Sequence, residues 1–245
     1  MKKGKLIIAA AAVAISPLLG ACVGRTNDGE KVRADYDRSL SDSIAVVEQE
    51  IDSCNTQIGL LRDQVNGWVR DFTTVSNPRE AGSYMILTSF KDRYPLSSTG
   101  LVARINDNNQ FELVAALSGK AFDRIEVQGP TATATSDVVP NDQALNYRTA
   151  ALTTVMFTGN AADSIGALVA DNQLNPITVT FMGNSPVQSW KLPEANAKMI
   201  SYTYMLYKSN KELNRLERRV PMLHEKINLL RIHKDRTAPA ADSAK

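Results

Sequence analysis

The two histidines of this chain are the residues best suited to bind a metal, and their spacing argues against it. His224 and Glu225 begin like the zinc-protease pattern His-Glu-x-x-His, but position 228 is Asn, so the second ligand is missing. His224 and His233 are nine residues apart, which places them on opposite sides of a helix. We therefore expect no metal site and no cofactor.

Residues 79–193 contain neither His nor Cys, so they lack the side chains of the common catalytic triads and thiol nucleophiles. This excludes the usual His-based triads and thiol nucleophiles from that region. The chain also lacks a Gly-x-Ser-x-Gly elbow and a glycine-rich phosphate or dinucleotide loop. Ten carboxylates in the region keep a catalytic carboxylate pair formally possible, but scattered surface acids are the simpler explanation. We expect a protein that is not an enzyme.

Four aromatic residues of the same region are candidates for a ligand platform. Flat aromatic side chains can bind a sugar or a peptide, although on strands they more often serve packing. The four are Tyr84, Tyr94, Tyr147 and Trp190.

The amino terminus has the features of an export signal. Lys2, Lys3 and Lys5 precede an apolar stretch over residues 6–19. This stretch is too short for a membrane span, which needs about 20 apolar residues, and fits the apolar region of a signal peptide. Leu19-Gly20-Ala21-Cys22 follows and resembles the lipobox of bacterial lipoproteins at all four positions.

The resemblance implies that residues 1–21 are removed and that Cys22 becomes the acylated, membrane-anchoring first residue. The residue after Cys22 is Val23. In lipoproteins of enteric bacteria, an Asp at this position signals retention in the inner membrane. By analogy with these bacteria, Val23 favours the outer membrane. The alternative is a plain secretory signal with an incidental cysteine. With cleavage, the whole-chain charge of +2 becomes −1, because three of the 28 basic residues are lost and all 26 acidic residues remain.

Two long segments carry apolar residues at alternating spacings of four and three, the a/d repeat of a coiled coil. The second repeat contains one polar position, Ser209, and continues through Pro221, so we expect one bent helix there. Cys54 occupies a predicted seam position, which favours burial over an intermolecular disulfide. The predicted seam residues are Leu40, Ile44, Val47, Ile51, Cys54, Ile58, Leu61, Val65, Trp68 and Phe72 in the first segment, and Tyr202, Leu206, Leu213, Leu216, Val220, Leu223, Ile227 and Leu230 in the second.

The two segments have opposite charges. Residues 30–75 hold five basic and nine acidic residues, whereas residues 194–236 hold ten basic and five acidic residues. The similar lengths and opposite charges of the two segments favour their antiparallel pairing within one chain. Each helix would be about 60 Å long at a rise of 1.5 Å per residue. Self-association of each segment in a homo-oligomer is the alternative.

The region between the segments alternates short apolar runs with turn residues, which predicts about eight strands and one short helix near residues 161–170. A sandwich or an open barrel suits this pattern. The fold class expected is therefore α+β: a long antiparallel coiled-coil hairpin with an inserted, mainly β domain. The predicted parts are a signal peptide (1–21), a linker after the lipidated cysteine (22–30), helix one (31–76), the β-rich domain (79–193), helix two (194–234) and a disordered tail (235–245).

These features predict a non-enzymatic, lipid-anchored lipoprotein of a bacterial cell envelope, whose coiled-coil stalk presents a β-domain for binding, scaffolding or assembly. Its expected partners are the membrane, through Cys22, and an envelope protein, with no role for nucleic acid. Two alternatives remain: an adaptor-like subunit of an envelope transport or secretion complex, and a surface lipoprotein that binds glycans or peptides. The periplasmic adaptors of efflux pumps also combine an anchor, a coiled coil and β-domains, but there the hairpin is inserted into the β-domains.

Overall fold

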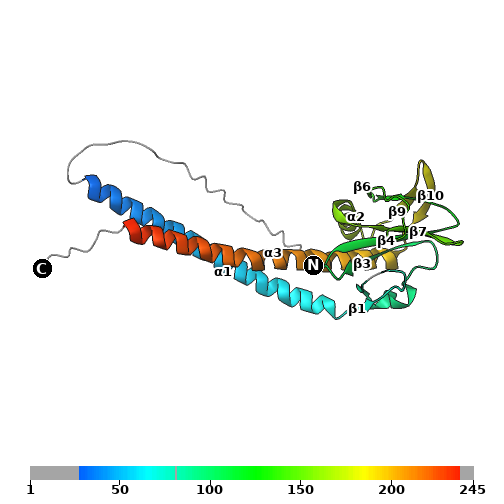
Figure 1. Cartoon of the computed structure of the whole chain (residues 1–245), viewed down its shortest axis with the longest axis horizontal. Coiled ribbons are helices and arrows are strands. Elements are labelled where there is room, and N and C mark those ends of the chain that lie inside the picture. Colours follow the sequence, from blue (N-terminus) through cyan, green and yellow to red (C-terminus); the bar gives the residue numbers. More distant parts are fainter. Residues whose placement is uncertain (1–27, 81, 238–245) are drawn as a thin grey trace. The chain divides into compact units, whose positions relative to one another are not determined.

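The computed structural model of this chain describes residues 28–80 and 82–237. The predicted signal peptide, Cys22 and most of the predicted tail lie outside the described residues. The fold combines a long helix at each end of the described chain with two open antiparallel sheets (Figure 1). Two compact units divide it: residues 47–228 form one, and the remaining parts of the two long helices, residues 28–46 and 229–237, belong to the other.

The long helices are α1 (Asp28–Val69) and α3 (Glu194–Thr237), and α3 continues through Pro221 without interruption. Within the larger unit, charged side chains connect them: Arg62 Nη2 lies 2.7 Å from Glu217 Oε1, and Arg219 Nε lies 2.7 Å from Glu50 Oε1. Within the smaller unit, the Tyr36 hydroxyl lies 2.6 Å from His233 Nε2. The two helices therefore pack against each other inside each unit.

Most of the predicted seam residues are shielded from solvent. Leu216 is only 2% exposed, and Cys54, which forms no disulfide within the described residues, is 6% exposed. The fully buried positions are Leu40, Val47, Ile51, Cys54, Ile58, Val65, Leu206, Leu216, Leu223 and Ile227, and the half-buried ones are Ile44, Leu61, Trp68, Leu213, Val220 and Leu230.

Two predicted seam residues lie elsewhere. Helix α1 ends at Val69, seven residues before the expected end, so Phe72 opens strand β1 (Phe72–Val75) instead of extending the helix. The run Phe-Thr-Thr-Val is β-prone, and a turn from Trp68 to Asp71 directs it toward the sheet. Tyr202 is 38% exposed, because the buried face of α3 passes through Thr203 and Leu206 at this level.

The first sheet has six antiparallel strands in the order β1-β2-β3-β4-β8-β7. Its centre is the hairpin of β3 and β4, in which Leu101 faces Ala115 and Arg104 faces Glu112. Strands β7 and β8 are separated by a turn at Thr149. The strands are β2 (Tyr84–Leu87), β3 (Gly100–Asn106), β4 (Phe111–Ser118), β7 (Asn146–Arg148) and β8 (Leu152–Phe157), with the 3-10 helix η1 (Thr88–Arg93) following β2.

The second sheet has four antiparallel strands in the order β10-β9-β5-β6. Neither sheet closes into a barrel, and the described region contains ten strands in two antiparallel sheets, two more than the eight or so expected. The strands are β5 (Arg124–Gln128), β6 (Thr133–Thr135), β9 (Thr178–Met182) and β10 (Pro186–Lys191).

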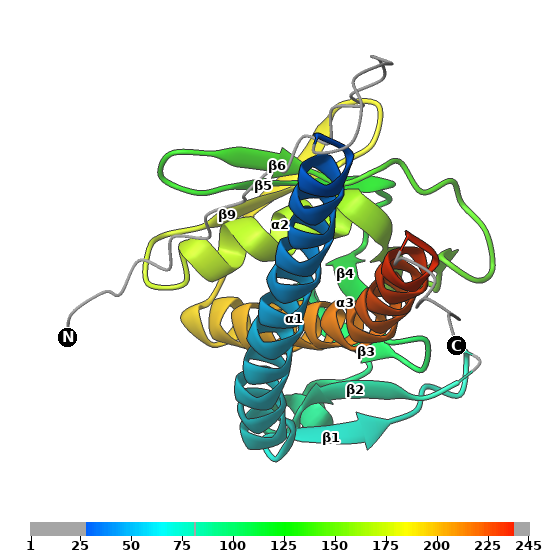
Figure 2. The ribbon, with the colours of Figure 1, turned by 90° about the vertical axis from the view of Figure 1, so that its left-hand side faces the viewer.

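One hydrophobic core joins both sheets to α2 (Gly159–Asp171) and to the first turns of α3. The Sδ atom of Met199 in α3 accepts the backbone N–H of Ala103 in β3 at 3.3 Å. Phe111 of β4 stacks edge-on against Tyr204 of α3, with ring centroids 5.4 Å apart. Figure 2 shows α2 and this part of α3 in front of strands β3 and β4. The start of α3 therefore belongs to the hydrophobic core that it shares with both sheets.

Candidate anion-binding groove

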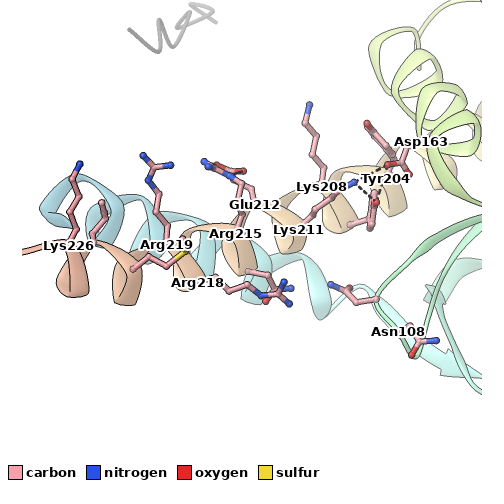
Figure 3. Close-up of a pocket in the computed structure, with 15 residues that line it drawn as sticks. Asn108, Asp163, Tyr204, Lys208, Lys211, Glu212, Arg215, Arg218, Arg219 and Lys226 are labelled. Carbon is pink, nitrogen blue, oxygen red and sulfur yellow. Dashed lines mark hydrogen bonds and ion pairs between the residues drawn. The ribbon is translucent and has the colours of Figure 1, made fainter. Parts of the chain in front are cut away.

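A groove of about 1160 Å³ runs beside α3 in the larger unit (Figure 3). Three elements form it: α3, the start of α2 and the turn between β3 and β4. Six basic and two acidic residues line it, a formal excess of four positive charges. The lining residues are Asn108, Asn109, Asp163, Tyr204, Tyr207, Lys208, Lys211, Glu212, Asn214, Arg215, Arg218, Arg219, Met222, Leu223 and Lys226.

Four of the cations form a row along α3. Lys208, Arg215, Arg219 and Lys226 are separated by seven, four and seven residues, spacings that bring side chains to the same face of a helix. In Figure 3 the four side chains extend to the same side of α3, whereas Arg218 extends toward the other side. Each residue of the row directly precedes a position of the heptad repeat. The four side chains therefore lie beside the face of α3 that packs against α1, and all four are exposed to solvent.

Several of these cations already have a carboxylate partner. Arg215 donates to Glu212 through Nε at 2.7 Å and Nη2 at 2.6 Å, and this contact lowers the pKa of Glu212 and raises that of Arg215. Arg219 pairs with Glu50 of α1. Lys211 Nζ lies 2.9 Å from the Tyr207 hydroxyl and 3.3 Å from Asp163, and these hydrogen bonds raise the pKa of Lys211.

Three cations of the groove have no partner within the part of the chain that the structure describes. Lys208, Arg218 and Lys226 are exposed and make no hydrogen bond, ion pair or ring contact there. Both acidic residues of the groove are paired, so these three positive charges are not compensated locally. An unpaired cation in a concave surface attracts anions and raises their local concentration.

The end of the groove nearest the first sheet carries aromatic side chains beside the charged Asp163 and Lys211. Tyr204 and Tyr207 pack against Phe111, and the Tyr207 hydroxyl lies 3.0 Å from Asp163 Oδ2. Burial, together with nearby Asp163, raises the pKa of the Tyr204 phenol. Asn109 adopts a positive φ of 57°, which asparagine tolerates, in the turn that brings its amide to the groove. The Tyr207 hydroxyl also accepts from Lys211 Nζ at 2.9 Å, so it is already engaged within the groove.

Of the four residues predicted to form a ligand platform, the structure brings only Tyr84 and Tyr94 together. Their ring centroids are 6.5 Å apart, and both lie beside the guanidinium of Arg104, which sits 3.5 Å above the centre of the Tyr84 ring. Tyr147 is stacked under Arg79 instead, and Trp190 belongs to the second sheet, where it packs against the hydrophobic core. The four do not form one platform.

Arg104 is the centre of a buried polar cluster, and its side chain is only 2% exposed. Its Nε donates to Glu112 Oε2 at 2.6 Å, and its Nη1 contacts both Glu80 and the Tyr94 hydroxyl. The remaining carboxylate oxygens accept from the Asn77 and Asn106 side chains. Because the cluster is closed to solvent and each carboxylate oxygen has a donor, we interpret it as structural.

Sequence reasoning missed both the groove and the cluster. The groove had a signal in the spacing of Lys208, Arg215 and Lys226, which repeats one residue away from the apolar heptad. The pairing of Arg104 with Glu112 had a weaker signal, since both are charged residues within apolar strand runs. No group of three or more His, Cys, Asp or Glu among the described residues is placed to hold a metal ion.

No helix within residues 28–80 and 82–237 is both long and apolar enough to cross a membrane. Cys22, the predicted lipidation site, lies outside the described residues. Comparison of the chain with known protein families, with curated proteins and with solved structures finds no match.

Proposed function

We propose that this chain is a non-enzymatic lipoprotein of a bacterial cell envelope that binds an anionic partner in the groove beside α3. The observation that carries the binding role is a set of three cations without a partner among the described residues, Lys208, Arg218 and Lys226, in a concave surface of about 1160 Å³. Concave surfaces of one charge sign are typical sites for ligands of the opposite sign.

Binding is tested by measuring the affinity of the mature chain, carrying Cys22→Ala for solubility, for an anionic polymer such as polyphosphate. The double variant Lys208→Glu/Lys226→Glu should weaken this affinity about tenfold or more and flatten its dependence on salt concentration. The control Lys91→Glu/Lys191→Glu makes the same change of net charge at two exposed lysines outside the groove. Equal losses in both variants would show that only net charge matters and would reject the groove as the site.

The membrane anchor is proposed from the lipobox at Leu19-Gly20-Ala21-Cys22. Acyl chains contribute about 0.8 kcal/mol per buried methylene, so a multiply acylated Cys22 holds a protein stably at a membrane, here the outer membrane. Cys22→Ala should abolish incorporation of radiolabelled palmitate and release the protein from the membrane fraction. A Cys54→Ala variant serves as the control and should remain acylated. Retention of an unacylated Cys22→Ala protein in the membrane would contradict the proposal.

We also propose that α1 and α3 form an antiparallel coiled-coil hairpin within one chain, with the two-sheet region inserted between them. Support comes from the burial of both apolar seams and from the ion pairs Arg62–Glu217 and Arg219–Glu50. Cysteines introduced at Ile58 and Leu216 in a Cys54→Ala chain should form an intramolecular disulfide. Products linked only between chains would favour a homo-oligomer.

A further inference from the structure

The two most exposed apolar side chains of the long helices in the larger unit lie on the same side of the helix pair. The ion pair between Glu50 and Arg219 marks this side. Leu60 of α1 occupies the heptad position next to that of Glu50, and Met222 of α3 occupies the position next to that of Arg219. Both Leu60 and Met222 are 68% exposed. Exposed apolar side chains that gather on one surface are typical of a site that a partner covers.

The other side of the helix pair is polar. The ion pair between Arg62 and Glu217 marks it, and its exposed positions on α1 include Asn55 and Gly59. Among the described residues of the two helices in this unit, the one exposed large apolar side chain on that side is Val69, at the end of α1. The helix pair therefore has one apolar side in addition to its own buried seam.

The smaller unit has the same asymmetry. Tyr36 and His233, which contact each other across the helix pair, mark the corresponding side. Val32 and Val46 of α1 are 69% and 54% exposed, and both occupy the heptad position next to that of Tyr36. Leu229 of α3 is 61% exposed and occupies the position next to that of His233. In each unit, exposed apolar residues thus accompany the same heptad positions.

The exposed row on α1 has the spacing of a second helix-packing surface. Its residues are seven apart and alternate between large and small side chains: Val32, Ser39, Val46, Ser53 and Leu60. Large side chains insert between those of a neighbouring helix, and small ones leave holes for it. The row therefore fits another helix with a heptad repeat better than it fits a flat membrane surface.

The charges beside the row have opposite signs on the two helices. Three residues after a row position, α1 carries an exposed acid: Asp35, Asp42 and Asp63. At the corresponding positions, α3 carries cations: Lys208, Lys211, Arg215 and Arg218. Asp63, like Lys208, makes no ion pair among the described residues. An anionic membrane would repel these acids, whereas α1 of one copy and α3 of another attract each other.

The levels of these residues along the helices suit a dimer with a twofold axis parallel to the helices. The ion pairs Glu50–Arg219 and Arg62–Glu217 place Ser53 at about the level of Met222, and Asp63 at about the level of Lys211. In such a dimer, α1 of each copy packs beside α3 of the other copy at these same levels. Met222 then fills the space beside the small Ser53, and Asp63 lies near Lys208.

We infer that the anionic partner of the groove is α1 of a second copy of this chain, and that the two copies form a twofold dimer through the side marked by Glu50 and Arg219. This inference rests on the proposed anion-binding function and names the partner of that site. The acids of α1 meet the cations of the groove, while Leu60 and Met222 leave solvent together.

Sedimentation equilibrium of the mature Cys22→Ala chain at micromolar concentrations tests the inference, and we expect a dimer. Leu60→Lys places a cation beside the cations of the second copy and should raise the dissociation constant of the dimer at least about tenfold. Asn55→Lys makes the same change of charge on the polar side of α1 and should leave the dimer intact. Circular dichroism shows whether both variants remain folded. A monomeric chain, or equal effects of the two variants, would overturn the inference.

Disulfide formation tests the arrangement of the two copies. Ser53→Cys/Met222→Cys, in a chain with Cys22→Ala and Cys54→Ala, should link two chains, because neither side chain points into the seam of its own helix pair. Gly59→Cys/Asn214→Cys, at matched positions on the other side, should give no link between chains. A Ser53/Met222 disulfide formed only within one chain would contradict the dimer.

Polyphosphate binding separates this inference from the function on which it rests. Leu60 does not line the groove, so the Leu60→Lys variant should still bind polyphosphate. A chain that binds polyphosphate but never dimerises would overturn the inference and leave anion binding intact. Binding of a monomeric chain to anionic phospholipid vesicles through Leu60 would also overturn it, with a membrane as the occupant. If Leu60→Lys does not bind polyphosphate, the proposed function itself is rejected.

Discussion

Arg104 and Glu112 are directly opposite each other on strands β3 and β4, and their side chains form an ion pair of 2.6 Å that is sealed from solvent. Glu80, from the turn before β2, contacts the same guanidinium, so one positive charge is surrounded by two carboxylates. The Tyr84 ring covers one face of the guanidinium. The cluster thus connects the loop ahead of β2 to the centre of the first sheet.

Removing the positive charge should be costly, because it leaves two carboxylates buried without a counter-ion. We expect Arg104→Met to lower the free energy of unfolding by about 3–5 kcal/mol, as measured by urea denaturation. The control is Arg62→Met, which breaks the exposed pair with Glu217 and should cost less than about 1 kcal/mol. Similar small losses for both variants would show that the buried cluster contributes little to stability.

Stability at alkaline pH should depend on Tyr94. Burial raises the pKa of the Tyr94 phenol, and the Arg104 charge offsets only part of this effect. The folded protein therefore keeps this proton when an unfolded tyrosine, with a pKa of about 10, begins to lose it. Because the folded state then binds more protons, the free energy of unfolding should fall as pH rises above about 10.

Urea denaturation of the wild type and of Tyr94→Phe at several pH values between neutrality and pH 11 checks this expectation. The variant should show a shallower loss of stability above about pH 10, because its residue 94 cannot ionise. Tyr202→Phe, at an exposed site, is the matched control and should follow the wild type. Parallel pH profiles for all three proteins would contradict a raised Tyr94 pKa.

The contact between α2 and α3 requires glycine at position 166. A Cβ atom there would lie 2.5 Å from Cδ2 of Tyr204 and 2.9 Å from two ring atoms of Phe111. We expect Gly166→Ala to destabilise the fold by about 1–3 kcal/mol through overpacking. Gly59→Ala, at an exposed position of α1 with nothing within 4 Å of the new atom, should instead stabilise it by about 0.5–1 kcal/mol.

Thermal unfolding of the two glycine variants distinguishes these outcomes, since the melting temperatures should move in opposite directions. A higher melting temperature for Gly166→Ala would mean that Tyr204 and Phe111 move aside without cost. In that case the aromatic end of the groove would be more adaptable than its packing indicates.

Several elements were predictable because their signal is local and periodic. The heptads around Ile51 and Leu223 identify two long helices, and alternating apolar runs identify most strands of both sheets. Strand β1 was missed because its only local signal, the run after Asp71, follows an unbroken helical repeat. Its pairing of Phe72 with Leu87 is a contact between residues distant in sequence.

The amino-acid sequence by itself was enough to predict the two long helices and to propose an export signal that ends at Cys22, since each depends on residue type and short-range spacing. Only the tertiary structure decided that Tyr84 and Tyr94 enclose Arg104, and which lysines of α3 remain without a partner. The physical reason is that charge compensation and burial depend on neighbours contributed by distant segments. Lys211 meets Asp163 and Arg219 meets Glu50, whereas Lys208 and Lys226 meet no carboxylate among the described residues, and no periodic pattern along the chain distinguishes these cases.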